Sequence, residues 1–211
     1  MNKLILSTHV PKTGGHSFLL ILRDLFGRSI FIDHPNHPRP YPACCVDEIR
    51  NREIRVIHGH GARIDKWENY LPPFEAVAWV RNPYTRVISH YEYALYRFRF
   101  GKHNPTLTEV LKAKDFEEYC KVMPSHQCAF LPLERLNDYS FVGIVEDYQR
   151  CLDAFGDRFL GVRDLYMPVD NVNNTRGPNA KYELTHEQKA SIEKYNEKDF
   201  ELYARAKERW V

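Results

Sequence analysis

The chain has 211 residues, of which 43% are hydrophobic and 27% are charged. This length is sufficient for one domain with a substantial core and is short for two. The formal net charge is only +2, so no general electrostatic field attracts nucleic acid. Any bound anion must therefore be held by locally clustered cations.

The first predicted element is a buried strand that runs into a glycine turn. Residues 3–10 are mainly apolar, the turn after them carries Lys12 and two adjacent glycines, and a helix opens near His16. Adjacent glycines let successive N–H groups face one point, and the N-terminus of the helix adds amides that have no acceptor within the helix. This arrangement predicts a phosphate-binding loop with Lys12 as its cation; a surface loop that only caps the helix is the alternative. It differs from a Walker A loop, in which the lysine follows the glycines.

The next predicted elements are a loop and a short strand. Residues 31–42 are rich in proline, histidine and asparagine and predict a loop at the rim of the site. Residues 54–57 predict a buried strand that ends in the sequence His58-Gly59-His60. Ligands bind at the carboxyl ends of strands in open α/β sheets, and an imidazole with a pKa of about 6.5 can accept a proton there. His60 is therefore a candidate general base, with His58 or an unrecognised glutamate as the alternative.

A third strand is predicted at residues 74–80, and it runs directly into Arg81. Asn82 is a favourable N-cap and Pro83 a favourable first helical residue. The helix that follows is predicted to bury a stripe formed by Tyr84, Val87, Ile88, Tyr91 and Leu95. At the carboxyl end of its strand, Arg81 offers a two-donor fork to a phosphate. A solvated arginine at an ordinary strand-to-helix junction is the alternative.

An irregular region follows at residues 97–139, with short helical pieces expected around Glu109 and Phe116. We expect this region to border the site. Its basic residues, Arg97 among them, are equally compatible with a solvated helix end.

The last third of the chain is predicted to contain a strand at Phe141, a helix after it, and a loop at residues 170–181. Glu146 and Asp147 stand at the start of the predicted helix, where carboxylates interact favourably with the helix dipole. A capping box at Thr185 opens one long packing helix that continues to Trp210.

The five cysteines show no spacing typical of a metal site, so metal binding is not expected. The N-terminal stretch lacks a charged leader followed by a long apolar core, so we expect a cytoplasmic protein without a membrane span. A lumenal location applies instead if the chain is a trimmed catalytic domain. The oligomeric state is left open.

Two of these motifs together resemble sulfotransferases that use 3'-phosphoadenosine 5'-phosphosulfate (PAPS). The order H-x-P-K-T-G-G-x-S after a strand resembles the family's 5'-phosphosulfate loop, and R-N-P-x-x-R-x-x-S resembles its 3'-phosphate motif. The sequence F-V-G-x-x-E at residues 141–146 is a further match. The H-G-H sequence is similar to the uronyl 2-O-sulfotransferases of heparan and dermatan sulfate, within the carbohydrate branch. His16 departs from the pattern, because the family usually has a small hydroxyl residue there.

Apolar strands that alternate with amphipathic helices predict an α/β fold, a P-loop-type sandwich with a mostly parallel central sheet flanked by helices. The resemblance implies a single sulfotransferase domain over residues 1–211, with an acceptor-side insertion at roughly 97–139 and a cofactor-covering loop at roughly 170–181. Cys120 and Cys128 are spaced like a pair that is bridged in some lumenal relatives, but free thiols are expected in a reducing cytoplasm.

The resemblance also implies roles for individual residues. His60 and Lys12 would be catalytic, Arg63 and Arg97 would contact the acceptor, and His58 would either contact the acceptor or support His60. The residues implied in nucleotide binding are Lys12, Thr13, Gly14, Gly15, His16, Ser17, Arg81, Ser89, Arg176 and Lys181.

The implied reaction is in-line transfer of a sulfuryl group from PAPS to a hydroxyl, with a carbohydrate as the expected acceptor and without a metal. The product nucleotide is adenosine 3',5'-bisphosphate. Two alternatives stay open: a P-loop kinase of a small molecule, and a non-catalytic nucleotide-binding module. A lipid-linked sugar or a small alcohol is also open as the acceptor.

Overall fold

The computed structural model describes residues 3–33, 43–100, 112–166 and 182–210. Its centre is a five-stranded sheet in the order β2-β3-β1-β4-β5. All four strand pairs are parallel, which confirms the predicted α/β class with a parallel sheet. The strands are β1 (Leu4–Thr8), β2 (Ile30–Ile32), β3 (Val56–Gly59), β4 (Phe74–Val80) and β5 (Phe141–Ile144).

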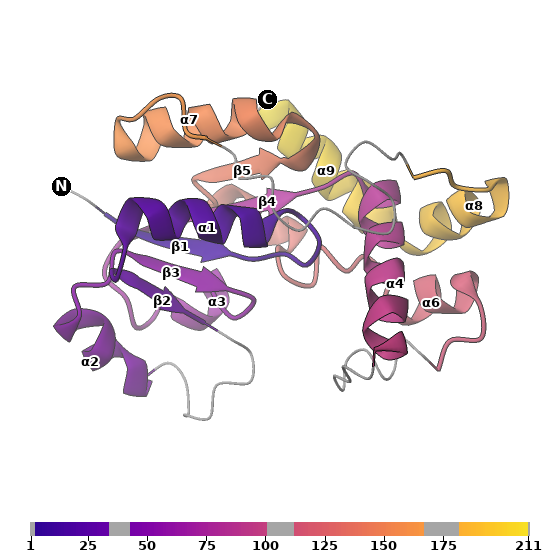
Figure 1. Ribbon diagram of the computed structural model, residues 1–211, viewed down its shortest axis with the longest axis horizontal. Coiled ribbons are helices and arrows are strands. Elements are labelled where there is room, and N and C mark those ends of the chain that lie inside the picture. Colours follow the sequence, from indigo (N-terminus) through magenta and orange to yellow (C-terminus); the bar gives the residue numbers. More distant parts are fainter. Residues whose placement is uncertain (1–2, 34–42, 101–111, 167–181, 211) are drawn as a thin grey trace.

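Helices surround this sheet and extend beyond one end of it (Figure 1). The α-helices are α1 (Gly15–Phe26), α2 (Ala43–Asn51), α3 (Ile64–Trp67), α4 (Pro83–Arg99), α6 (Phe116–Val122), α7 (Tyr148–Leu160), α8 (His186–Tyr195) and α9 (Glu197–Trp210). Two short 3-10 helices are η1 (Leu133–Asp138) and η2 (Val145–Asp147). Within the described ranges, each helix lacks the length or the apolar character that a membrane span requires.

One face of the sheet is covered by α1 and α7. The buried Phe18 ring of α1 lies 5.3 Å from the Trp79 ring of β4 and 5.2 Å from the Phe155 ring of α7. Burying large aromatic side chains in this way is a major source of core stability. This packing fixes the position of α1, and therefore of the loop that precedes it.

The other face of the sheet carries Thr8 and Phe31. The Thr8 hydroxyl donates to the carbonyl of Ala62 at 2.6 Å and lies 2.9 Å from the Tyr139 hydroxyl. The Phe31 ring meets the Trp67 ring of α3 edge-on at 6.1 Å. The residues that follow β3 are thereby anchored to the end of β1.

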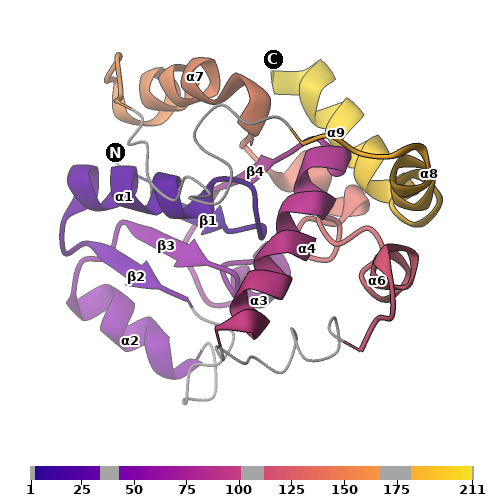
Figure 2. The ribbon, with the colours of Figure 1, turned by 45° about the vertical axis from the view of Figure 1, so that its right-hand side comes forward.

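A second group of helices lies beyond the carboxyl ends of the strands (Figures 1 and 2). Helices α4, α6 and α8 share a small apolar core of their own, built from Val87, Ala94, Tyr119, Cys120 and Ile192. The group stands beside the sheet edge where β1, β3 and β4 end, so it forms one wall of any site at that edge.

The connections after β1 and β4 run in opposite directions. The chain leaves β1 through α1 toward β2 at one edge of the sheet, and it leaves β4 through α4 toward β5 at the other edge. Neighbouring strands with divergent connections leave a crevice between their carboxyl ends, where α/β proteins bind ligands. The loops that carry Lys12 and Arg81 border this crevice.

Three element predictions were wrong in detail. Residues 30–32 form strand β2, although the loop was expected to begin at residue 31; residues 34–42 of that loop lie outside the described residues. Strand β3 is shifted toward its carboxyl end and includes His58 and Gly59. On α4, the expected buried residue Leu95 is 44% exposed, and its neighbour Ala94 is buried instead.

The C-terminal segment forms two helices where one was expected. The predicted capping box at Thr185 is confirmed, but α8 ends at the buried Asn196 and α9 begins after it. The Asn196 side-chain amide donates to the carbonyl of Ile192 at 3.1 Å and so helps to end α8. Hydrophobic periodicity misses this break because the apolar pattern continues on both sides.

Candidate active site

The loop between β1 and α1 has the backbone geometry of an anion-binding turn. Lys12 and Gly14 both have positive φ, at 67° and 75°, and Gly14 is the left-handed N-cap of α1. A Cβ at Gly14 would lie 2.9 Å from the Tyr148 ring, so only glycine fits. Helix α1 begins without a side-chain cap. Amides in the first turn of a helix have no acceptor within the helix, so they can donate to an anion bound at this end.

Within this loop, Thr13 is buried and its hydroxyl donates to the carbonyl of Val10 at 2.8 Å. This bond shapes the turn from the inside. Ser17 is half-buried on the first turn of α1, and His16 is exposed beside it. The exposed ring of His16 therefore stands at the mouth of the loop.

The Lys12 ammonium lies in the crevice. Its Nζ is 4.4 Å from the centroid of the Tyr93 ring on α4, a cation–π contact. Burial and the nearby Arg81 guanidinium lower the pKa of Lys12 to about 8, although Glu92 raises it. Two cations that destabilise each other in the free protein are well placed to share an anion.

Arg81, the residue after β4, reaches across the crevice to the glycine loop. Its Nη1 donates to the carbonyl of Lys12 at 3.4 Å, and its Nε donates to the Thr85 hydroxyl at 3.0 Å. Its guanidinium carbon lies 5.6 Å from the centroid of the Tyr182 ring. The two predicted phosphate-binding motifs therefore face one crevice.

The N-terminus of α4 is fixed by one carboxamide, that of Asn82, and one carboxylate, that of Glu146. The predicted N-cap is confirmed, because the Asn82 side chain accepts the Tyr84 N–H at 3.0 Å. Glu146 of η2 accepts the Asn82 N–H at 3.1 Å and also binds Tyr203. Glu146 was expected to favour its own helix; the structure shows that it anchors the start of α4.

Helix α4 presents a stripe of polar and aromatic residues at a spacing of four. Ser89 is buried and lies one turn from Thr85 and one turn from Tyr93, since residues four apart share a helix face. The Arg97 guanidinium carbon lies 5.9 Å from the centroid of the Tyr93 ring, which also contacts Lys12. Ser89 and Arg97 thus belong to the wall that holds Lys12.

Three histidine rings stack along the edge of β1 and β3. The His9 ring lies 5.2 Å from the His58 ring and 4.2 Å from the His60 ring, in both cases nearly parallel. His9 is also tied to β3, because its N–H donates to the carbonyl of Gly59 at 2.9 Å. His9 was not predicted as a site residue.

The hydrogen bond of His60 fixes its tautomer. Its Nδ1 lies 2.6 Å from the carbonyl oxygen of His9. A carbonyl can only accept, so Nδ1 carries the hydrogen and the lone pair of the neutral ring is on Nε2. This is the tautomer that a general base requires, and the ring is half-buried at the crevice.

His58 is placed differently from the expectation. Its side chain is 1% exposed, and Nδ1 lies 2.9 Å from the Ser7 hydroxyl within the sheet. A ring so buried has no surface to offer an acceptor, so of the two predicted roles the structure fits the supporting one, with His58 packed against His9.

The remaining predicted contacts divide into two groups. Arg63 is at the edge of the sheet and is ion-paired with Asp65, which raises the pKa of Arg63. Arg176 and Lys181 lie outside the described residues. Their roles stay predictions.

Residues 126–130 lie beside His60, inside the region 97–139 that was expected on the acceptor side, although no individual residue of the segment was predicted. The Phe130 ring lies 5.7 Å from the His60 ring and 5.2 Å from the His126 ring. Burial and the nearby Arg86 lower the pKa of His126 to about 3, so its ring is neutral. No sequence motif marks this segment, so its position beside His60 is seen only in the folded structure.

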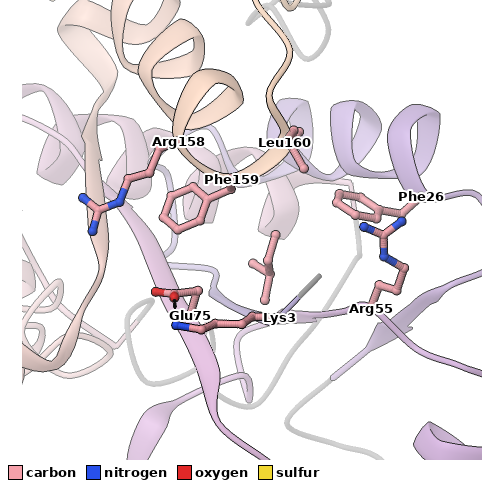
Figure 3. A pocket seen from close by; sticks show the side chains of 8 residues that line it. Lys3, Phe26, Arg55, Glu75, Arg158, Phe159 and Leu160 are labelled. Atoms are coloured by element: carbon pink, nitrogen blue, oxygen red, sulfur yellow. Dashed lines mark hydrogen bonds and ion pairs between the residues drawn. The ribbon is translucent and has the colours of Figure 1, made fainter. Parts of the chain in front are cut away.

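A separate cavity of about 240 Å³ opens at the opposite edge of the sheet (Figure 3). It is lined by Lys3, Ile5, Phe26, Arg55, Glu75, Arg158, Phe159 and Leu160. Lys3 precedes β1, Glu75 is the second residue of β4, and the two side chains form an ion pair at 2.7 Å. The cavity is therefore at the amino-terminal ends of β1 and β4 and is not part of the candidate site.

Cys120 and Cys128 are unbridged, and burial raises the pKa of the Cys120 thiol to about 12. Among the described residues, no cluster of histidine, cysteine, aspartate and glutamate has the composition of a metal site.

Comparison with known proteins decides the family. The profile described as "Sulfotransferase family" matches residues 2–204. The chain belongs to this family. A search of curated proteins gives no match. Among solved structures, the chain is similar to a sulfotransferase from Alicyclobacillus acidocaldarius, with a TM-score of 0.50 and 13% sequence identity, over 100% of this chain and 98% of that one.

Family membership and this fold together support sulfuryl transfer as the general chemistry. In this sulfotransferase the glycine loop, Arg81 and His60 all border one crevice at the carboxyl edge of the sheet. The loop and arginine can hold an anionic donor, and His60 can take a proton from an acceptor.

The packing of His9 against Gly15 gives a stability test. A Cβ at Gly15 would lie 2.0 Å from Cδ2 of His9, whose ring is held between two other histidines. We expect Gly15→Ala to lower the free energy of unfolding by about 1–3 kcal/mol, measured by urea denaturation. In a His9→Ala background the same change should cost less than about 0.5 kcal/mol, because the clash is gone. An equal cost in both backgrounds would contradict the contact.

Proposed function

We propose that this sulfotransferase moves a sulfuryl group from PAPS to a hydroxyl of a carbohydrate. The observation that carries the proposal is the contact between Arg81 and the carbonyl of Lys12 across the crevice between β1 and β4. It brings two anion-binding motifs to one place, as a nucleotide with phosphates at both its 5' and 3' positions requires. The resemblance of both motifs to the PAPS sites of sulfotransferases supports the same donor.

The residues of the crevice fit this donor. The donor supplies an activated sulfuryl group and leaves as adenosine 3',5'-bisphosphate. Lys12 and the first amides of α1 would stabilise the charge that develops on the 5'-phosphate, while Arg81 and Ser89 would hold the 3'-phosphate. Fixed cations and backbone dipoles of this kind lower a barrier because they need no reorganisation during the reaction.

His60 would act as the general base. Its Nε2 would take the proton from the acceptor hydroxyl while the acceptor oxygen bonds to sulfur and the bond from sulfur to the phosphate oxygen breaks. The bond from Nδ1 to the His9 carbonyl would keep the ring in the required tautomer and would stabilise the imidazolium that forms.

The acceptor is proposed to be a glycan hydroxyl. The resemblance of His58-Gly59-His60 to uronyl 2-O-sulfotransferases supports this class. The Phe130 ring beside His60 offers an apolar face, which suits a sugar ring as well as an aromatic alcohol. A cytoplasmic location also stays a prediction.

A nucleotide test distinguishes this donor from that of a kinase. We expect adenosine 3',5'-bisphosphate to raise the melting temperature of the protein by several degrees at saturation, because it binds only the folded state. ADP with magnesium should give little shift. The measurement is a thermal-shift titration with both nucleotides. Stabilisation by ADP with magnesium alone would reject the proposed donor.

A His60→Ala variant tests the base. We expect sulfuryl transfer to fall by about 10²- to 10⁴-fold, the usual contribution of a positioned general base, while affinity for adenosine 3',5'-bisphosphate is retained. The assay uses radiolabelled PAPS with a panel of carbohydrate acceptors. His186→Ala, at the exposed start of α8, serves as the control. Unchanged transfer by His60→Ala would contradict the role.

The pKa of Lys12 predicts how nucleotide affinity depends on pH. Lys12 is charged below a pKa of about 8 and loses its proton above it. Affinity for adenosine 3',5'-bisphosphate should therefore be highest below pH 8 and fall about tenfold per unit as the pH rises above 8. The nucleotide phosphates have a second pKa of about 6, so above pH 8 they no longer titrate and Lys12 determines the trend.

The matched variant is Lys12→Arg, whose charge does not titrate here. Calorimetric titration between pH 7 and pH 9.5 should show a falling affinity for the wild type and a nearly constant one for the variant. A wild-type affinity that is constant or rises with pH would contradict the assignment.

A further inference from the structure

The backbone of Arg81 is held by a side chain that no motif includes. The Gln127 Oε1 accepts the Arg81 N–H at 2.9 Å, and the Gln127 Nε2 donates to the Arg81 carbonyl at 2.9 Å. Gln127 is fully buried. Its carboxamide thus pairs with both backbone polar groups of one residue, as a neighbouring strand would.

The backbone of Arg81 needs a side-chain partner because the strands on either side of β4 end before this residue. The last pairing of β4 with β1 is Ala78 with Thr8, and its last pairing with β5 is Val80 with Ile144. Arg81 comes one residue later, before the first turn of α4. Backbone groups at such a junction need other partners, because unpaired groups are costly when they are not solvated. Gln127 supplies both.

Gln127 is itself fixed from α9. The Asp199 carboxylate accepts the Gln127 N–H at 3.1 Å and the Cys128 N–H at 3.0 Å. Asp199 is fully buried, and Nη2 of the equally buried Arg86 lies 3.8 Å from it. The charge of Asp199 is therefore balanced inside the protein, and the turn at residues 126–128 has a rigid support.

We infer that Gln127 is a positioning residue that sets the affinity of the site for the 3'-phosphate of the nucleotide. This inference rests on the proposed function, in which the Arg81 guanidinium binds that phosphate. The side chain of Arg81 donates hydrogen bonds to Thr85 and to the Lys12 carbonyl. The position from which that side chain extends is set by the backbone, which Gln127 holds. A displaced backbone would move the guanidinium fork away from the phosphate, and geometry governs bidentate recognition.

The sharpest readout compares two nucleotides. Adenosine 3',5'-bisphosphate carries the 3'-phosphate, and AMP lacks it. Gln127→Met keeps the volume of the side chain but removes both hydrogen bonds. We expect the affinity for adenosine 3',5'-bisphosphate to fall about tenfold, as for the loss of a pair of buried hydrogen bonds, and the affinity for AMP to stay within about twofold. Gln149→Met is the control, because Gln149 also makes two side-chain hydrogen bonds, to Asp153 and to the Leu165 carbonyl.

Kinetics give an independent readout. The 3'-phosphate is remote from the sulfur, so its contacts contribute equally to the ground state and the transition state. Gln127→Met should therefore raise the KM for PAPS about tenfold and leave kcat nearly unchanged. Should this variant fail to fold, Gln127→Glu replaces it: the carboxylate still accepts the Arg81 N–H but repels the Arg81 carbonyl, and the same selective loss is expected.

The Arg81→Ala variant distinguishes a failure of the proposed function from a failure of the inference about Gln127. If Arg81→Ala leaves the preference for adenosine 3',5'-bisphosphate over AMP unchanged, the proposed function is wrong about the 3'-phosphate. If Arg81→Ala abolishes the preference but the Gln127 variant does not, only the present inference is overturned. An equal loss of affinity for both nucleotides in the Gln127 variant would also overturn it, because a general structural role would then suffice. In the double variant, the expected loss equals that of Arg81→Ala alone.

Discussion

The site depends on the parallel pairing of β1 with β4. These strands are adjacent in the sheet, yet the chain leaves them in opposite directions, through α1 and through α4. Divergence of this kind leaves a ligand crevice at the carboxyl ends of the strands, and there Nη1 of Arg81 donates to the carbonyl of Lys12 at 3.4 Å. Residues that are 69 positions apart in the chain thus face the same space. The depressed pKa of Lys12 is the electrostatic consequence, since burial and a second cation both disfavour its charge.

Around this crevice, backbone carbonyls and buried side chains orient the reactive groups. The His9 carbonyl determines which nitrogen of His60 carries the hydrogen, and the His9 ring has room only because residue 15 is glycine. The same principle applies on the other side, where Gln127 binds both backbone groups of Arg81. The groups proposed to react therefore have little freedom of their own, and such preorganisation is what makes electrostatic stabilisation effective.

The second arginine of the R-N-P-x-x-R motif shows how one short sequence can serve two purposes. Arg81 is directed into the crevice, whereas Arg86, five residues later, is fully buried and lies near Asp199 and His126. A buried ion pair is costly to desolvate, and removal of one partner leaves an uncompensated buried charge. In this protein the pair joins α4 and α9, and Asp199 also holds the turn at residues 126–128. Burial and Arg86 also hold the pKa of His126 near 3. A neutral His126 avoids a further positive charge beside Arg86.

The sequence by itself determined the parallel α/β class, the glycine loop before α1, the Asn82 cap and the placement of Arg81 and His60 at strand ends, because these features depend on local patterns. Periodicity could not detect the break at Asn196 or the exposure of Leu95, since both depend on what packs against the helix. Only the tertiary structure decided that His58 is buried, that His9 orients His60, and that residues 126–130 border the site. Those contacts join segments far apart in the chain, and the free energy that selects them comes from packing that no short stretch of sequence contains.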